Sequence, residues 1–97
     1  MTMFAIALER APLKLRGYLS RYMLQIRAGV FVADHNQGLR DRLWEQVVDG
    51  IKDGYAMMAY SGKTEGKMIL REIGEDQRCL VVLDGLFLIA SKASTDG

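Results

Sequence analysis

Residues 3–8 read MFAIAL, an uninterrupted apolar run that is typical of a central strand covered on both faces. Pro12 follows, and proline suits the first turn of a helix because the N–H group that it lacks would have no partner there. Apolar residues then recur at helical spacing, so the sequence predicts a helix from Pro12 to about Ile26. Its buried stripe comprises Leu15, Leu19, Tyr22, Met23 and Ile26, with Arg16 at the edge and Lys14, Tyr18 and Arg21 opposite.

A second strand and a second helix follow. The segment GVFV at residues 29–32 is rich in strand-forming residues, and residues 34–36 read DHN, which favours a turn or a helix cap. A helix is predicted from Gln37 to about Asp53, and Gly54 is expected to end it in the left-handed conformation. The predicted buried stripe is Leu39, Leu43, Trp44, Val47 and Ile51, with Arg40, Asp41, Glu45 and Asp49 largely elsewhere.

The last third of the chain predicts strands. Apolar runs at residues 55–60 and 67–73 flank a polar turn, and residues 74–78 are interpreted as a loop. Asp84 and Gly85 separate two further apolar runs, which is a strong hairpin signal. Residues 79–91 are therefore expected to form a terminal hairpin that can dock on another subunit, and residues 92–97 are expected to be disordered.

This order of elements predicts one α+β domain over residues 1–97. The expected architecture is a ferredoxin-like split βαβ sheet with both helices on one face and an extra C-terminal hairpin. Strands that are apolar on both sides, such as residues 55–60, require that the other face of the sheet also be covered. A chain of 97 residues buries only about 60% of its surface on folding. We therefore expect a homodimer.

Charge is distributed unevenly, although the net charge is only +1. The segment from Arg10 to Ala33 holds five cations and no acidic residue. Such a local field can attract phosphate, and it is equally compatible with a solvated helix face.

The sequence also bears on location. No apolar run approaches the roughly 20 residues that a membrane helix needs, and the N-terminal residues lack the pattern of a signal peptide. Cys79 is the single cysteine, which excludes an intramolecular disulfide and fits a reducing compartment. We expect a cytoplasmic protein with no membrane partner.

Four blocks of sequence carry a family resemblance: LE with PLKLRG (8–9 and 12–17), IRAGVFV (26–32), LWEQ (43–46) and LDGL (83–86). In this order and at these intervals they resemble CRISPR-associated protein 2 of the type I-E branch, over residues 3 to about 91. The resemblance implies a ferredoxin-like homodimer held between subunits of the CRISPR integrase, CRISPR-associated protein 1. In such complexes the central dimer supports a short DNA duplex, the prospacer, and the integrase performs the strand transfer.

The implied function is a non-catalytic scaffold for spacer acquisition in antiviral defense, which binds duplex DNA and bridges integrase subunits. Spaced cations suit this role because duplex DNA carries about one charge per 1.7 Å of its axis. The candidates carried over are Lys14, Arg16 and Arg78, with Arg27 as a further DNA-binding candidate. Two positions depart from the family pattern, because Gln77 replaces an expected arginine and Gly38 an expected lysine, which lowers the expected number of phosphate contacts.

Two other functions stay open at this point. Glu9 follows the first strand, where the wider family carries an acidic residue that can bind Mg²⁺ as a metal ligand and catalytic group. The alternative is thus a magnesium-dependent endonuclease that cleaves single-stranded RNA or double-stranded DNA. A single-stranded RNA binder is the third class, and it needs exposed aromatic residues on central strands, where only Phe4 and Phe31 are available.

Overall fold

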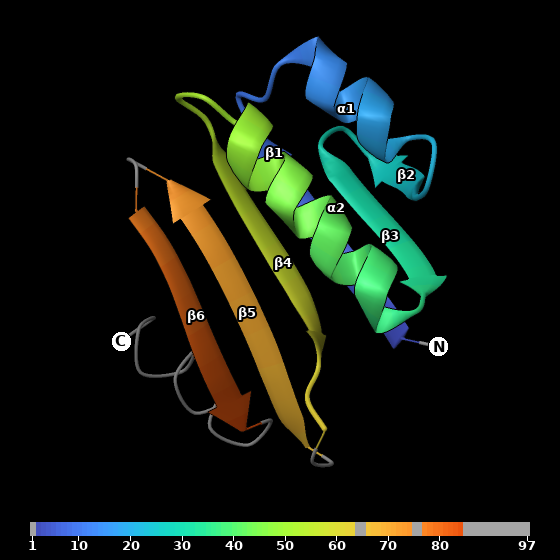
Figure 1. Cartoon of the computed structure of the whole chain (residues 1–97), viewed down its shortest axis with the longest axis vertical. Coiled ribbons are helices and arrows are strands. Elements are labelled where there is room, and N and C mark those ends of the chain that lie inside the picture. Colours follow the sequence, from blue (N-terminus) through green and yellow to red (C-terminus); the bar gives the residue numbers. More distant parts are fainter. Residues whose placement is uncertain (1, 64–65, 75–76, 85–97) are drawn as a thin grey trace.

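The computed structural model describes residues 2–63, 66–74 and 77–84, which form six strands and two helices (Figure 1). In chain order these are β1 (Thr2–Glu9), α1 (Leu13–Leu19), β2 (Leu24–Arg27), β3 (Val30–His35), α2 (Gln37–Gly50), β4 (Tyr55–Ser61), β5 (Lys67–Gly74) and β6 (Gln77–Asp84).

All six strands belong to one antiparallel sheet with the order β2-β3-β1-β4-β5-β6. Strand β3 separates β1 from β2, and β1 separates β3 from β4, so each helix connects two strands that are not neighbours. This is the split βαβ order of a ferredoxin-like core, which confirms the predicted α+β class. The hairpin β5–β6 extends the sheet beyond β4.

Both helices pack on the same side of the sheet, called here the helix side. Along β1, Phe4, Ile6 and Leu8 are buried, whereas Ala5 and Ala7 between them are only partly buried. Because side chains alternate along a strand, the buried set points to one face. It forms a single cluster with Leu15 and Leu19 of α1 and with Leu43, Trp44 and Val47 of α2. Figure 1 shows α2 lying across the sheet with α1 beside it.

Helix α1 is shorter than its apolar spacing predicts. It ends at Leu19, and residues 24–27 instead form β2, in which Leu24 pairs with Val32 and Gln25 with Phe31. Ile26 was expected in the buried stripe and is 55% exposed. The prediction was wrong because pairing with β3 overrides local periodicity. Gly29 makes the connecting turn at a φ of 77°, and a Cβ there would lie 2.5 Å from the carbonyl oxygen of Leu8.

Two further expectations need correction. Helix α2 ends at Gly50, and the residue with positive φ after it is Lys52, not Gly54. Gly54 is required for a different reason, because a Cβ there would lie 2.4 Å from the carbonyl oxygen of Glu9. Residues 77 and 78 belong to strand β6, not to a loop, so the observed hairpin joins β5 to β6. Residues 86–90 of the predicted hairpin and residues 92–97 lie outside the described part.

Candidate nucleic-acid interface

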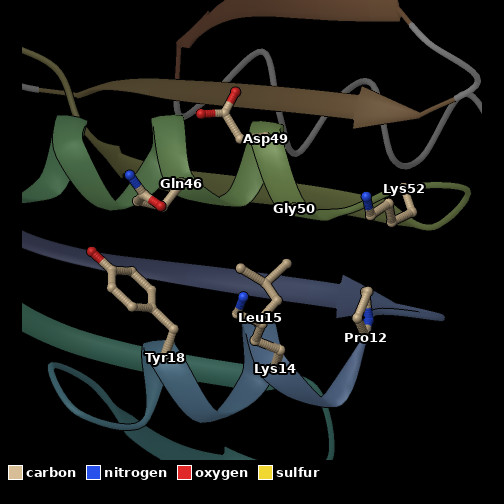
Figure 2. A pocket seen from close by; sticks show the side chains of 8 residues that line it. All are labelled: Pro12, Lys14, Leu15, Tyr18, Gln46, Asp49, Gly50 and Lys52. Carbon is tan, nitrogen blue, oxygen red and sulfur yellow. The ribbon is translucent and has the colours of Figure 1, made fainter.

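The predicted DNA-binding residue Lys14 lies at a groove between the two helices. It is exposed in the first turn of α1, and Lys52 faces the same groove from the end of α2 (Figure 2). The groove has a volume of about 320 Å³, and Gln46 and Asp49 add polar groups to its wall. Tyr18, expected on the exposed side of α1, is half-buried and packs against the core from this groove. Two lysines thus face one groove, Lys14 from α1 and Lys52 from the turn that follows α2.

Arg16 lies one half-turn after Lys14, at the edge of the core as predicted. Its side chain is half-buried, and its Nε–H group is buried with no hydrogen-bond acceptor in the part of the chain that the structure describes. A buried donor without an acceptor costs about 1–3 kcal/mol. Arg16 therefore keeps one unpaired donor at the edge of the core, and this Nε–H group is shielded from solvent in the described structure.

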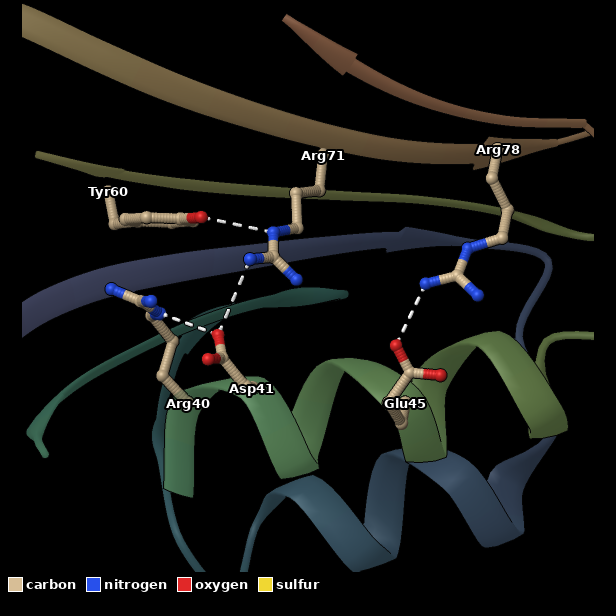
Figure 3. A network of polar contacts seen from close by, with 6 residues as sticks. All are labelled: Arg40, Asp41, Glu45, Tyr60, Arg71 and Arg78. Atoms are coloured by element: carbon tan, nitrogen blue, oxygen red, sulfur yellow. Dashed lines mark hydrogen bonds and ion pairs between the residues drawn. The ribbon is translucent and has the colours of Figure 1, made fainter. Parts of the chain in front are cut away.

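Arg78 lies on the helix side of β6, opposite Ile73, which is buried in the core. Its Nη2 donates a hydrogen bond of 2.8 Å to Oε2 of Glu45 on α2 (Figure 3). Both side chains are half-exposed, at 50% and 53%. Arg78 is therefore on the same side of the sheet as Lys14 and Arg16, with α2 between them.

A polar network beside Arg78 was not predicted from the sequence. Arg40 is only 7% exposed, and its guanidinium lies 3.8 Å from the centre of the Tyr60 ring. Arg71 donates from Nε to the Tyr60 hydroxyl over 3.0 Å, and its Nη2 lies 3.5 Å from Oδ1 of Asp41 (Figure 3). Asp41 also pairs with Arg40 at 3.1 Å. The signal for Arg40 was its spacing, because it precedes the buried Trp44 by four residues.

The remaining basic candidate lies elsewhere. Arg27 is exposed at the end of β2, and its pairing with Val30 places it on the sheet face opposite the helices. It does not join the other three cations. His35 has a structural role, because its Nε2 lies 3.0 Å from the carbonyl oxygen of Tyr22 and ties the end of β3 to the turn after α1.

The sheet face opposite the helices, called here the open face, is apolar across its middle. Strand pairing aligns one residue from each strand in a continuous row: Leu24, Val32, Ala5, Ala59, Leu70 and Val81. Met3 and Leu24 on this face are 71% and 67% exposed. Leu24 is exposed and the other five residues of the row are partly buried, and no element in the described ranges packs across them.

Glu9 lies at one end of the open face, opposite Tyr55 of β4. The Tyr55 hydroxyl donates a hydrogen bond to Glu72, and Cys79 pairs with Glu72 across β5 and β6. Burial raises the pKa of the Tyr55 phenol above its ordinary value of 10.0, and the hydrogen bond to Glu72 and the charges of Glu72 and Glu9 raise it further. Cys79 is a free, exposed cysteine.

Comparison with known families decides where the chain belongs. Residues 3–88 match the family model described as CRISPR-associated protein (Cas_Cas2CT1978), which spans nearly the whole chain. The chain belongs to this family. The match extends from β1 to the residues beyond β6, so it includes every predicted site residue of this CRISPR-associated protein.

The magnesium site expected at Glu9 can be compared with the carboxylates that the described residues place around it. Among the described residues, no three His, Cys, Asp or Glu side chains converge where they could hold a metal ion. Glu9 and Glu72 are both near Tyr55, and Glu72 already accepts the phenol hydrogen bond. The described residues therefore do not supply a complete ligand set, and a site at Glu9 would need oxygen donors from outside them.

Two further observations bear on the alternatives. Phe4 and Phe31 are 3% and 0% exposed beneath the helices, so neither can stack on a nucleic-acid base. This argues against the single-stranded RNA binder. Among the described residues, neither helix has the length and apolar character needed to cross a membrane.

Proposed function

We propose that this CRISPR-associated protein is a homodimeric, non-catalytic subunit that holds duplex DNA during spacer acquisition. The observation that carries the proposal is the difference in chemical character between the two faces of the sheet. Spaced cations lie on the helix side, and an uncovered apolar row crosses the open face.

The open face supports the dimer. Its apolar row crosses six strands, which at about 4.8 Å per step extends roughly 24 Å. Contiguous exposed apolar surface of this extent marks an interaction site on a soluble protein. A second copy is the simplest partner, since a two-fold axis brings identical apolar rows face to face. The helix sides of both copies then point outward.

The outward helix sides support the contact with DNA. Lys14 and Arg16 lie on α1 and Arg78 lies on β6, so the three cations do not converge in one pocket. A double helix needs such spacing, because its phosphates are distributed along an axis. Contacts of this kind position the DNA without reading its sequence. The integrase subunit is proposed as the partner, and membership of a CRISPR-associated family supports this proposal.

The proposal is tested by titrating a fluorescent DNA duplex with the wild-type protein and with the double variant Lys14→Glu/Arg16→Glu. The variant is expected to bind at least tenfold more weakly. The slope of log affinity against log salt should become shallower by about 0.9 for each lost phosphate contact. A control with the same change in charge, Arg21→Glu/Arg42→Glu, uses two other exposed cations and should retain more of the affinity. Failure of the wild-type protein to bind duplex DNA, alone or with the integrase subunit, would refute the proposal.

A further inference from the structure

A second groove on the helix side, between α2 and the β5–β6 hairpin, has a volume of about 220 Å³. Its floor includes the buried Trp44, and its walls carry Arg71 and Arg78. Arg71 pairs with Leu80 and Arg78 pairs with Ile73, so the two arginines are diagonal neighbours on adjacent strands. Diagonal neighbours lie about 7–8 Å apart, within reach of long side chains. Two guanidinium groups can therefore contact the same short segment of a phosphate backbone.

Each of these guanidinium groups meets a carboxylate from α2. Glu45 accepts the hydrogen bond of Arg78 at 2.8 Å, and Asp41 lies 3.5 Å from Nη2 of Arg71. Asp41 and Glu45 are separated by one helical turn, so α2 presents two carboxylates to the two arginines (Figure 3). A carboxylate oxygen occupies the position that a phosphate oxygen takes in an arginine–phosphate pair.

The two pairs differ in how firmly the arginine is held. The side chain of Arg71 is 22% exposed, and its Nε–H is fixed on the Tyr60 hydroxyl, which leaves its Nη groups directed toward α2. Arg78 and Glu45 are both half-exposed, and an ion pair in that setting contributes little to folding because water and salt screen it. Replacing Glu45 by a phosphate oxygen therefore costs the fold little.

We propose that the groove between α2 and β6 binds a phosphate of duplex DNA, with Arg71 acting beside Arg78, and that Glu45 occupies Arg78 until the phosphate replaces it. The inference rests on the proposed function and extends it by one binding residue, Arg71, and one internal competitor, Glu45. The proposal predicts that removing the Glu45 carboxylate raises the affinity for DNA. Removing a purely structural ion pair leaves DNA affinity unchanged or lower, whereas removing a competitor raises it.

The test compares duplex binding by wild-type protein, Glu45→Gln, Arg78→Gln and the double variant, measured by fluorescence anisotropy over a range of salt concentrations. Glu45→Gln is expected to tighten binding about fivefold, since no carboxylate then occupies Arg78 in place of the phosphate. The same substitution in the Arg78→Gln protein is expected to have no effect. Arg71→Gln is expected to weaken binding about threefold and to make the salt slope shallower.

A matched control is Asp34→Asn, which changes the net charge equally at an exposed residue of β3 that pairs with Met3 on the open face. It should alter the affinity less than twofold, because charges further apart than about 8 Å are screened at physiological salt. Circular dichroism of each variant, followed through thermal unfolding, establishes that the variants are folded.

The outcomes separate the two proposals. Unchanged or weaker binding by Glu45→Gln, with Lys14→Glu/Arg16→Glu still impaired, overturns the competitor role and leaves the proposed function standing. Unchanged binding by Arg71→Gln removes Arg71 from the site. Tighter binding by Glu45→Gln only to an RNA duplex of the same sequence overturns the assignment to DNA. If wild-type protein binds no duplex, both proposals fail together.

Discussion

Strand β4 carries one tyrosine on each face of the sheet, and the two rings show how different the faces are. Tyr60 lies on the helix side, 8% exposed, where Arg40 stacks on its ring and its hydroxyl accepts from Arg71. Tyr55 lies on the open face, half-buried, where its hydroxyl donates to Glu72 with Glu9 nearby. One tyrosine is surrounded by cations and the other by carboxylates, although they are only five positions apart in the sequence.

The difference follows from what covers each face. On the helix side, α2 brings its own charged side chains over the outer strands and supplies a counter-ion for each arginine. On the open face no described element does this, so small apolar residues fill the middle and polar residues stay at the ends. The helix side thus suits contact with an anion, and the open face suits contact with another apolar surface.

The largest effect is expected for Ala59→Arg, which places a charge in the middle of the apolar row. If a second copy covers the open face, the buried and unpaired cation should cost about 3–5 kcal/mol and weaken dimerisation by more than 100-fold. Sedimentation velocity would measure this, with Gln37→Arg on the exposed start of α2 as the control. A dimer that tolerates Ala59→Arg without loss would place the interface elsewhere.

A smaller effect is expected for Tyr60→Phe on the helix side. The substitution removes the acceptor of the Arg71 Nε–H and keeps the ring beneath Arg40, so it should lower the free energy of unfolding by about 1–2 kcal/mol. Urea denaturation would measure it. An unchanged stability would mean that water replaces the hydroxyl, and that the network contributes nothing to holding β5 on α2.

The corresponding change on the open face, Tyr55→Phe, should alter how the free energy of unfolding depends on pH. The folded-state pKa of Tyr55 is raised above 10.0, so the phenol keeps its proton in the folded state while the unfolded chain loses it. The stability of wild-type protein relative to Tyr55→Phe should therefore be constant below pH 10 and fall as pH rises through the raised pKa. Denaturation at neutral pH and above pH 10 would measure the difference, and a parallel dependence in both proteins would contradict it.

The least change is expected for Glu9→Gln. If the protein is a scaffold, duplex affinity should change less than twofold, because Glu9 lies on the open face away from Lys14 and Arg78. The same variant tests the enzyme alternative with magnesium and labelled RNA or DNA. Metal-stimulated cleavage by the wild-type protein that disappears in Glu9→Gln would favour the nuclease over the scaffold.

Much of the fold could be predicted where local sequence and tertiary pairing agree. The apolar run of β1 and the stripe of α2 were identified because core-facing apolar residues recur regularly along each element. Strand β2 was missed, since Tyr22, Met23 and Ile26 continue the helical spacing of α1 and only pairing with β3 makes the segment extended.

The residues of the candidate site were likewise predicted only in part. Lys14, Arg16 and Arg78 were named from their places in family motifs, and the structure puts all three on the helix side. Arg71 was missed because nothing in its own segment distinguishes it from a surface residue. Its contacts with Tyr60 and Asp41 join three elements that are distant along the chain.

The sequence by itself determined the α+β class, the CRISPR-associated family and the alternation that gives the strands two faces, because these depend on patterns within short segments. Only the tertiary structure decided that Arg78 is paired with Glu45, that Arg40 is buried against Tyr60 and that the apolar row of the open face is continuous. Those features require residues from different strands and helices to meet, and the register that brings them together is set by packing of the whole sheet.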